Sequence, residues 1–280
     1  MPEEIEFQTK PEIALDQIAR ALDSGLPCGV VLADAGYGSD TRFRERLAEM
    51  GLQYVVGVQG SVSVWRPGEA PLPPKVRGRV GRPPKLLRRS KNHRPVSARE
   101  LVIEMGQGAL RRVAWREGSN RKLQSRFVAV RVRPAHRDYW RAEPHEELWL
   151  LAEWPRGSAE PTKYWLADLP AETTLEELVR LAKHRWIVER DYLELKQELG
   201  LEHFEGRSWR GFHHHATLCI AAYGFLVAER SLFPLGACGE AQAGRSGAAG
   251  GLPAAGQPGG RSGGIRRVQS RASGKASPAG

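Results

Sequence analysis

Apolar and polar positions near the start of the chain recur at helical spacing, which predicts a helix between Thr9 and Gly25. Thr9 is a typical capping residue, Pro11 suits a first helical turn, and Gly25 ends the pattern. The apolar positions of this helix are Ile13, Leu15, Ile18, Ala19 and Leu22. Residues 29–33 then form a short, continuous, valine-rich run. Such a run predicts a central strand that is buried on both faces.

A second helix and a second strand follow in the pattern. Ser39 or Asp40 caps the helix, Gly51 ends it, and residues 54–58 form the strand. The apolar face of the helix consists of Phe43, Leu47 and Met50. Strand, helix and strand in alternation predict an α/β core. Asp34 directly follows the first strand, where open α/β sheets bind ligands, although a turn residue or a helix-capping acid has the same pattern.

The pattern changes in residues 61–165, where proline, arginine and lysine are dense. Short alternating apolar runs in this region predict strands that are separated by turns. The runs are residues 112–116, 127–132 and 148–152. We interpret the region as a β-rich insertion between the two halves of one core, residues 1–60 and residues 166–232.

Helical spacing returns after the insertion. Thr174 caps a predicted helix, and a further helix follows and ends near Gly200. The first of these helices has its apolar positions at Leu175, Leu178, Val179 and Ala182. The apolar run at residues 216–229 predicts a buried helix, because it is too short and too interrupted to span a bilayer. Residues 233–280 are rich in glycine, alanine, proline, serine and arginine, which predicts disorder.

Three charged residues in the second of these helices have a spacing that is informative. Arg185, Glu189 and Lys196 lie four and seven positions apart, so a helix places them on one face. A guanidinium, a carboxylate and an ammonium on one face suit a site for a divalent metal and phosphate. A solvated face with an ion pair would have the same spacing. An apolar stripe beside them predicts that the charged face borders a buried one; the stripe is Val188, Tyr192, Leu195 and Leu199.

These residues resemble a known signature. The segment with Arg185, Glu189 and Lys196 is similar to the Tyr-Arg-Glu-Lys signature of bacterial insertion-sequence transposases, which are DDE enzymes with a ribonuclease-H-like core. Residues 30–38 resemble the strand that ends on the second catalytic Asp of the family, and residues 197–215 resemble the segment after the catalytic Glu. The resemblance covers residues 1–232, and Ala182 stands where the signature has its Tyr.

The resemblance implies both chemistry and a missing part. It makes Asp34 and Glu189 catalytic metal ligands for Mg²⁺ of the two-metal type, and it places Arg185 and Lys196 on the phosphates. The first catalytic Asp of the family lies upstream of Met1. The resemblance therefore implies an N-terminally truncated, partial ribonuclease-H-like core, with its first strands and one metal ligand missing, and an inactive fragment. The alternative is a DNA-binding remnant without chemistry that interferes with a full-length transposase.

The charge of the chain favours a polyanionic partner. The net charge is +10 and the isoelectric point about 9.8. Residues 75–89 are strongly basic, lack acids and contain prolines that favour an extended chain, so they are either a solvated loop or a contact to DNA phosphates. The residues that we expect on DNA are Arg77, Arg79, Arg82, Lys85, Arg88, Arg89, Trp209 and Arg210. The resemblance specifies double-stranded DNA, at transposon ends and target, and leaves open a homodimer or an association with full-length transposase.

Histidines and cysteines indicate little further chemistry. His213, His214 and His215 are consecutive, so they point in different directions, and packing or phosphate contact is favoured over a zinc-dependent hydrolase site. Three scattered cysteines offer neither a disulfide framework nor a zinc spacing, which indicates a reducing cytoplasm. The acidic start has no apolar signal segment. We therefore expect a cytoplasmic, nucleoid-associated protein that does not enter the membrane.

Overall fold

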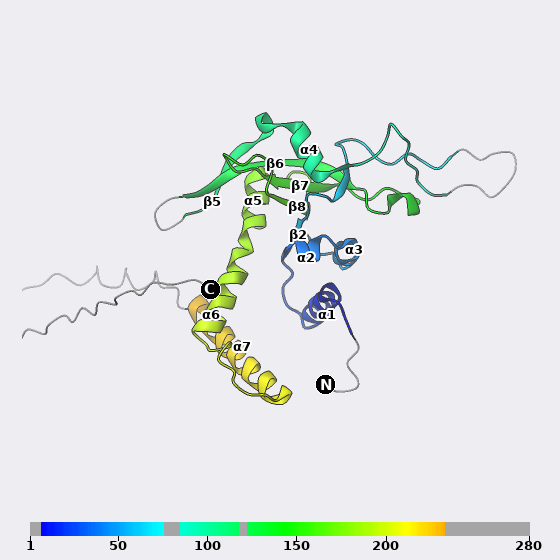
Figure 1. Cartoon of the computed structure of the whole chain (residues 1–280). Helices are drawn as coiled ribbons and strands as arrows, with labels where there is room; N and C mark the ends of the chain where they lie inside the picture. The colour runs from blue at the N-terminus through cyan, green and yellow to red at the C-terminus, as the bar shows by residue number, and fades with distance from the viewer. Residues whose placement is uncertain (1–6, 76–84, 118–121, 233–280) are drawn as a thin grey trace, which may run out of the picture. The chain divides into compact units, whose positions relative to one another are not determined.

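The computed structural model describes residues 7–75, 85–117 and 122–232. The described strands form one mixed eight-stranded sheet in the order β1-β2-β8-β7-β6-β3-β4, with β5 paired to β6 (Figure 1). The strands are β1 (Val31–Ala33), β2 (Tyr54–Val58), β3 (Ser63–Trp65), β4 (Val96–Ser97), β5 (Arg111–Glu117), β6 (Lys122–Pro134), β7 (Leu148–Glu153) and β8 (Lys163–Asp168). A mixed α/β fold is therefore confirmed.

Strand β1 is an edge strand of this sheet, not the central strand that its valine-rich run predicts. It pairs in parallel with β2, with Val31 opposite Tyr54, and all three of its residues are only partly buried. In the described part of the chain no other strand pairs with β1, so one of its edges lacks a neighbour. The fully buried strand is β2, which lies between β1 and β8.

The sheet crosses both boundaries of the expected insertion. Strand β2 pairs antiparallel with β8 along its whole length, and β8 itself contains residues 165 and 166. Strands β6 and β7 continue the sheet from β8. Residues 61–165 thus extend the sheet that begins with β1 and β2, and the division of the chain into a core and an insertion stays a prediction.

The helices begin where the sequence places capping residues. Thr9 and Glu12 form a capping box at α1, Asp40 rather than Ser39 caps α3, and Thr174 caps α5. The helices are α1 (Lys10–Asp23), α2 (Ala35–Gly38), α3 (Thr41–Glu49), α4 (Ala98–Met105), α5 (Leu175–His184), α6 (Trp186–Gln197) and α7 (Trp209–Leu232), with short 3₁₀ turns η1 (Gln107–Ala109) and η2 (Asp138–Trp140). Gly25 follows α1 with φ +78°, a left-handed conformation that glycine adopts without strain.

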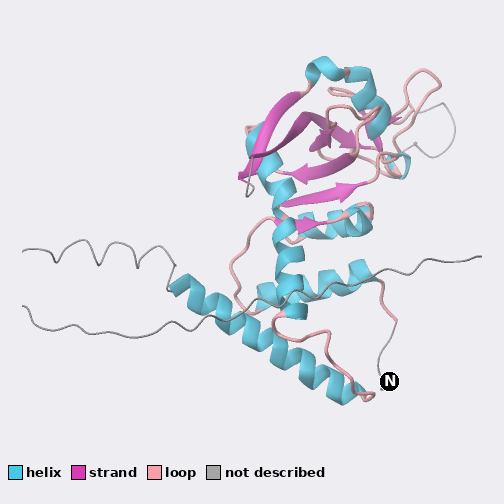
Figure 2. Cartoon of the chain, turned by 60° about the vertical axis from the view of Figure 1, so that its left-hand side comes forward, coloured by secondary structure: helices cyan, strands magenta, loops and turns pink. Residues whose placement is uncertain are grey.

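Helices cover both faces of the sheet (Figure 2). Adjacent strand residues point to opposite faces, so Leu166 of β8 joins one buried cluster and Trp165 the other. One cluster contains Phe43 and Leu47 of α3 and residues of α4; the other contains Leu178, Val179 and Ala182 of α5. Each fully buried aliphatic side chain of this kind stabilises the fold by about 1.5–3 kcal/mol. Helix α5 is thereby held firmly on the sheet.

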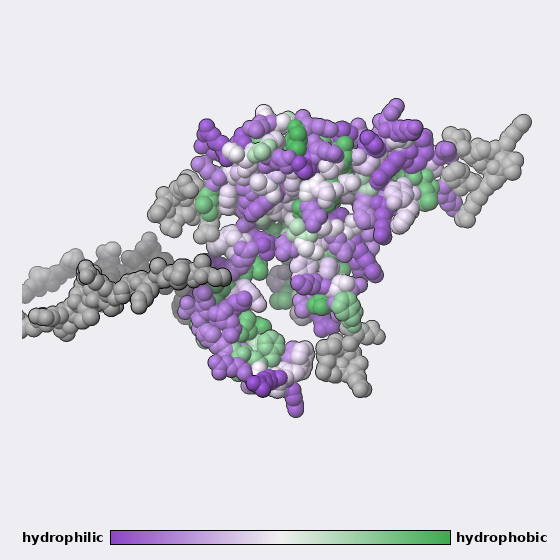
Figure 3. Space-filling model, in the orientation of Figure 1, coloured by the Kyte–Doolittle hydropathy of each residue, from purple (hydrophilic) through white to green (hydrophobic). Residues whose placement is uncertain are grey.

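Helices α6 and α7 are much less buried than the sequence predicts. Helix α6 has no buried residue, and Val188 of its apolar stripe is 59% exposed. Only Cys219 of α7 is buried, although a buried helix was expected for residues 216–229. Helix α7 has apolar residues on all sides, a pattern typical of a buried helix, but the described elements cover little of it. Figure 3 shows apolar side chains on the surface there. No helix in the described ranges is long and apolar enough to cross a membrane.

Candidate active site

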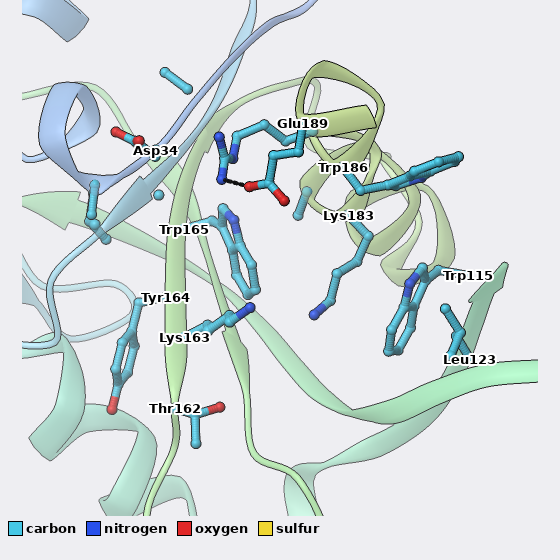
Figure 4. Close-up of a pocket in the computed structure, with 16 residues that line it drawn as sticks. Asp34, Trp115, Leu123, Thr162, Lys163, Tyr164, Trp165, Lys183, Trp186 and Glu189 are labelled. Carbon is cyan, nitrogen blue, oxygen red and sulfur yellow. Dashed lines mark hydrogen bonds and ion pairs between the residues drawn. The ribbon is translucent and has the colours of Figure 1, made fainter. Parts of the chain in front are cut away.

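Three of the catalytic residues expected from the sequence line one pocket. Asp34, Arg185 and Glu189 border a pocket of about 410 Å³, together with residues of β2, β5, β6, β8 and the end of α5 (Figure 4). The other residues of its wall are Ala33, Ala35, Gly57, Val58, Trp115, Leu123, Thr162, Lys163, Tyr164, Trp165, Ala182, Lys183 and Trp186. The fold thus brings two carboxylates that are far apart in the sequence to the same hollow.

Asp34 occupies the turn between β1 and α2. Its Oδ1 accepts a hydrogen bond of 2.9 Å from the backbone N–H of Gly36, so the residue caps α2 as one of its two interpretations predicts. The side chain is exposed at the pocket, and the capping bond occupies one carboxylate oxygen. Among the residues that the structure describes, no hydrogen bond to the second oxygen, Oδ2, is found.

Two glycines hold the Asp34 turn against β2. A Cβ on Gly38 would lie 2.1 Å from the carbonyl oxygen of Gly57, and a Cβ on Gly57 would lie 3.0 Å from the amide nitrogen of Ala35. Arg44 is buried below this turn and donates hydrogen bonds to the carbonyl of Gly38 and, at 3.1 Å, to the hydroxyl of Thr41. Burial lowers the pKa of the Arg44 guanidinium. The position of Asp34 is therefore set by close packing of backbone on backbone.

Glu189 lies in the first turn of α6, where the helix dipole favours a carboxylate. Arg185 occupies the break between α5 and α6, and its guanidinium donates to Glu189 Oε1 at 2.5 Å (Figure 4). Their side chains are 37% and 65% exposed, so the pair contributes well under about 1 kcal/mol to stability. The pair holds one oxygen of the Glu189 carboxylate against the Arg185 guanidinium at the pocket wall.

Lys196 does not reach this pocket. It lies in the last turn of α6, and its Nζ is 4.6 Å from the ring centroid of Tyr192. Lys196 is eleven positions after Arg185, which corresponds to roughly 16 Å along a helix axis. Residues on one face of a helix point in the same direction, but they can lie far apart along its axis. Arg185 and Lys196 are too far apart along α6 to line the same pocket.

Lys183 is a pocket residue that the sequence reasoning missed. Its Nζ donates to Glu153 Oε2 at 2.6 Å and lies 4.6 Å from the ring centroid of Trp115. Burial lowers the pKa of the Lys183 ammonium, and the hydrogen bond to Glu153 opposes that shift. A signal for it exists in the sequence: Lys183 directly follows the apolar face of α5, and Glu153 ends an apolar strand.

The residues expected on DNA divide into four groups. Arg77, Arg79 and Arg82 lie outside the described residues. Lys85 is exposed, and Arg88 is partly buried and donates to the carbonyl of Pro73 at 3.1 Å. These two remain candidates for phosphate contact.

Arg89, in contrast, is partly buried and is paired with a buried carboxylate. Its guanidinium contacts Asp138 Oδ1 at 2.6 Å, and the indole N–H of Trp65 donates to Asp138 Oδ2 at 2.7 Å. Asp138 is 0% exposed, and a buried carboxylate requires a cationic partner. Arg89 is thus paired with Asp138 inside the protein, and its contact with DNA stays a prediction.

The aromatic turn at the start of α7 is exposed. Trp209 and Arg210 lie in the first turn of α7, and the Trp209 ring stacks edgewise at 4.1 Å from the ring of His213. His213 and His214 are exposed, whereas His215 Nε2 lies 2.9 Å from the carbonyl oxygen of Gly200. The three histidines have different surroundings, so His215 has a packing role.

Asp34 and Glu189 are the two carboxylates in the wall of the pocket. Mg²⁺ is commonly held by one or two carboxylates, water and substrate phosphates, so these two side chains are the ones that would hold such an ion. Within the part of the chain that the structure describes, no group of three or more acidic, histidine or cysteine side chains is placed to hold a metal ion. The described residues therefore do not supply a three-carboxylate set for two cations.

Comparison with known proteins gives a match over part of the chain. Residues 1–122 match the family model of the DDE superfamily endonuclease. No curated protein matches the chain. The matched part contains Asp34, β1 and β2 and ends before the helix with Glu189. The match supports a DDE-type endonuclease or transposase with DNA as its substrate class, and the mixed sheet fits an α/β nuclease domain.

Proposed function

We propose that the chain is a transposase polypeptide of a bacterial insertion sequence, which binds double-stranded DNA and acts on its phosphodiester bonds with Mg²⁺. The observation that supports this most directly is that Asp34 and Glu189 line one pocket together with Arg185. The match of residues 1–122 to a DDE endonuclease model supports the same class of reaction independently of Glu189. A ribonuclease-H-like core is the corresponding proposal for the fold, with β1 and β2 as its parallel pair.

In this proposal each charged residue of the pocket has a distinct role. Asp34 Oδ2 and the Glu189 carboxylate would hold the cation, while Arg185 keeps the Glu189 carboxylate turned toward it. A bound Mg²⁺ would supply charge for the phosphate and activate the attacking oxygen. The Arg185 guanidinium also suits a phosphate oxygen, since its planar fork has several donors. Lys196, further along α6, would contact DNA phosphates outside the pocket.

The test measures metal binding with matched carboxylate variants. Mn²⁺ replaces Mg²⁺ as a paramagnetic probe, because carboxylate sites take both ions. We expect Asp34→Asn and Glu189→Gln each to weaken Mn²⁺ binding at least tenfold. In Asp34→Asn the side-chain amide oxygen would still accept the bond from Gly36, so the turn is kept. The controls Asp23→Asn and Glu198→Gln change exposed acids outside the pocket and should leave the affinity unchanged.

A second measurement asks whether the metal acts on DNA. Contrary to the inactive fragment that the resemblance implies, the wild-type chain should nick supercoiled plasmid in the presence of Mn²⁺ or Mg²⁺, and Glu189→Gln should not. Binding of DNA without any metal-dependent nicking would instead favour a DNA-binding protein without chemistry. Mn²⁺ affinity that is equal in wild type, Asp34→Asn and Glu189→Gln would refute the proposed site.

A further inference from the structure

We propose that Lys183 is a positioning residue for this site: its buried pair with Glu153, inside a box of aromatic rings, fixes the junction of α5 and α6 and so holds Glu189 at the pocket. The inference rests on the proposed function, because it concerns the same two carboxylates. It concerns a residue that does not itself contact the cation in the proposal.

The Lys183 ammonium is held by one hydrogen bond and by three aromatic rings. The ammonium donates to Glu153 Oε2 at 2.6 Å, and the ring centroids of Trp115, Trp165 and Phe127 lie 4.6, 5.4 and 5.5 Å from Nζ. Each ring attracts the cation over its face. Figure 4 shows Lys183 extending between the helix and Trp115 at the pocket wall.

The location of this box explains why it matters for Glu189. Lys183 lies in the last turn of α5, two residues before the break at Arg185. Helix α5 is held on the sheet by its apolar face, but α6 has no buried residue. The direction in which α6 leaves the sheet is therefore determined at the junction. Glu189 is in the first turn of α6, so a change of direction there would move its carboxylate relative to Asp34.

An ion pair at this place has a property that an apolar contact lacks. Removing one partner leaves a buried, unpaired charge, which is strongly destabilising, whereas replacing both partners by apolar side chains of similar size is often neutral. A hydrogen bond and three ring contacts also restrict the direction of the side chain, which an aliphatic chain does not. Stability and positioning can therefore be separated by experiment.

The separating variant is the double substitution Lys183→Met and Glu153→Met. Met fills the volume of both side chains without charge, so the thermal midpoint should stay near that of the wild type. The affinity for Mn²⁺ should nevertheless fall about tenfold or more, as for residues that orient metal ligands without binding the metal. The matched control is Lys163→Met, which removes an exposed ammonium from the wall of the same pocket and should change the affinity much less.

Hydrogen–deuterium exchange gives a readout that does not depend on metal. In the double variant the amides of residues 184–197 should exchange faster, while those of β7 and β8 keep wild-type rates. If wild type binds no Mn²⁺, the proposed function fails, and the exchange rates alone decide the role of Lys183. Wild-type Mn²⁺ affinity in the double variant, or unchanged exchange in residues 184–197, would overturn the proposal and leave the pair as a stabilising contact only.

Discussion

Replacing Gly38 with alanine should disturb the candidate site from inside the fold. Gly38 closes the turn that begins with Asp34, and its Cα faces β2 so closely that an added Cβ would lie 2.1 Å from the Gly57 carbonyl oxygen and 2.7 Å from Val56 Cβ. The nearest atom is backbone, so no side-chain rotation can relieve the contact. The φ of Gly38 is not in the left-handed region, so the methyl group adds no backbone strain of that kind to the clash.

The size of the effect follows from the distance. An ordinary carbon–oxygen contact is about 3.3 Å or longer, so the turn or the strand must move by about 1 Å. Overpacking of this kind typically costs about 1–3 kcal/mol. For a folded unit of this size, each kcal/mol lowers the melting temperature by about 2–4 °C, which gives a decrease of about 2–12 °C. Because the same movement displaces Asp34, Mn²⁺ binding should weaken together with stability.

The assay compares three glycines by thermal and urea unfolding. At Gly57 an added Cβ would approach Ala35 N to 3.0 Å, so Gly57→Ala should be less destabilising than Gly38→Ala. At Gly29 nothing lies within 4 Å, so Gly29→Ala should be neutral or slightly stabilising. If Gly38→Ala unfolds at the same temperature and urea concentration as Gly29→Ala, the close approach of turn and strand is refuted.

Two further predictions concern the loop after β6. Burial lowers the pKa of His145 below its ordinary 6.5, so the unfolded chain binds more protons at mildly acidic pH and stability should fall as pH drops below about 6.5. His145→Gln should reduce that loss in urea titrations at pH 7 and pH 5, and the exposed-residue control His214→Gln should not; equal losses in all three proteins would contradict this. Asp138→Asn keeps an acceptor for Trp65 but removes the charge beside Arg89, so it should lower the free energy of unfolding by about 1–3 kcal/mol, and an unchanged urea midpoint would contradict a structural role.

The features that the sequence predicts well are those in which neighbouring residues are sufficient. Thr9, Asp40 and Thr174 cap helices because the backbone donors that they satisfy lie two or three residues away. The placement of Asp34 directly after β1, and of Arg185 one turn before Glu189, likewise depends on local spacing. These local facts were enough to select three residues that line the same pocket.

The features that the sequence misses depend on which strands become neighbours. Glu153 and Lys183 meet only because α5 packs on the sheet that contains β7. Arg89 and Asp138 meet although they lie 49 positions apart in the sequence. No periodicity specifies such pairs. The apolar stripe on α6 was expected to border a buried face, but Val188 is exposed. Helical spacing identifies an apolar face, whereas its burial depends on which other element packs against it.

The two carboxylates of the candidate site are anchored in different ways, and this difference has consequences. Asp34 belongs to a turn that packs backbone to backbone on β2, so a disturbance there affects the core as well as the site. Glu189 belongs to a helix without buried residues, whose direction is determined at the end of α5. Substitutions near Asp34 should therefore lower stability and metal affinity together, whereas substitutions on α6 should lower the affinity alone. The α6 half of the site is also the half that a bound cation or DNA can order, because its own packing fixes it least.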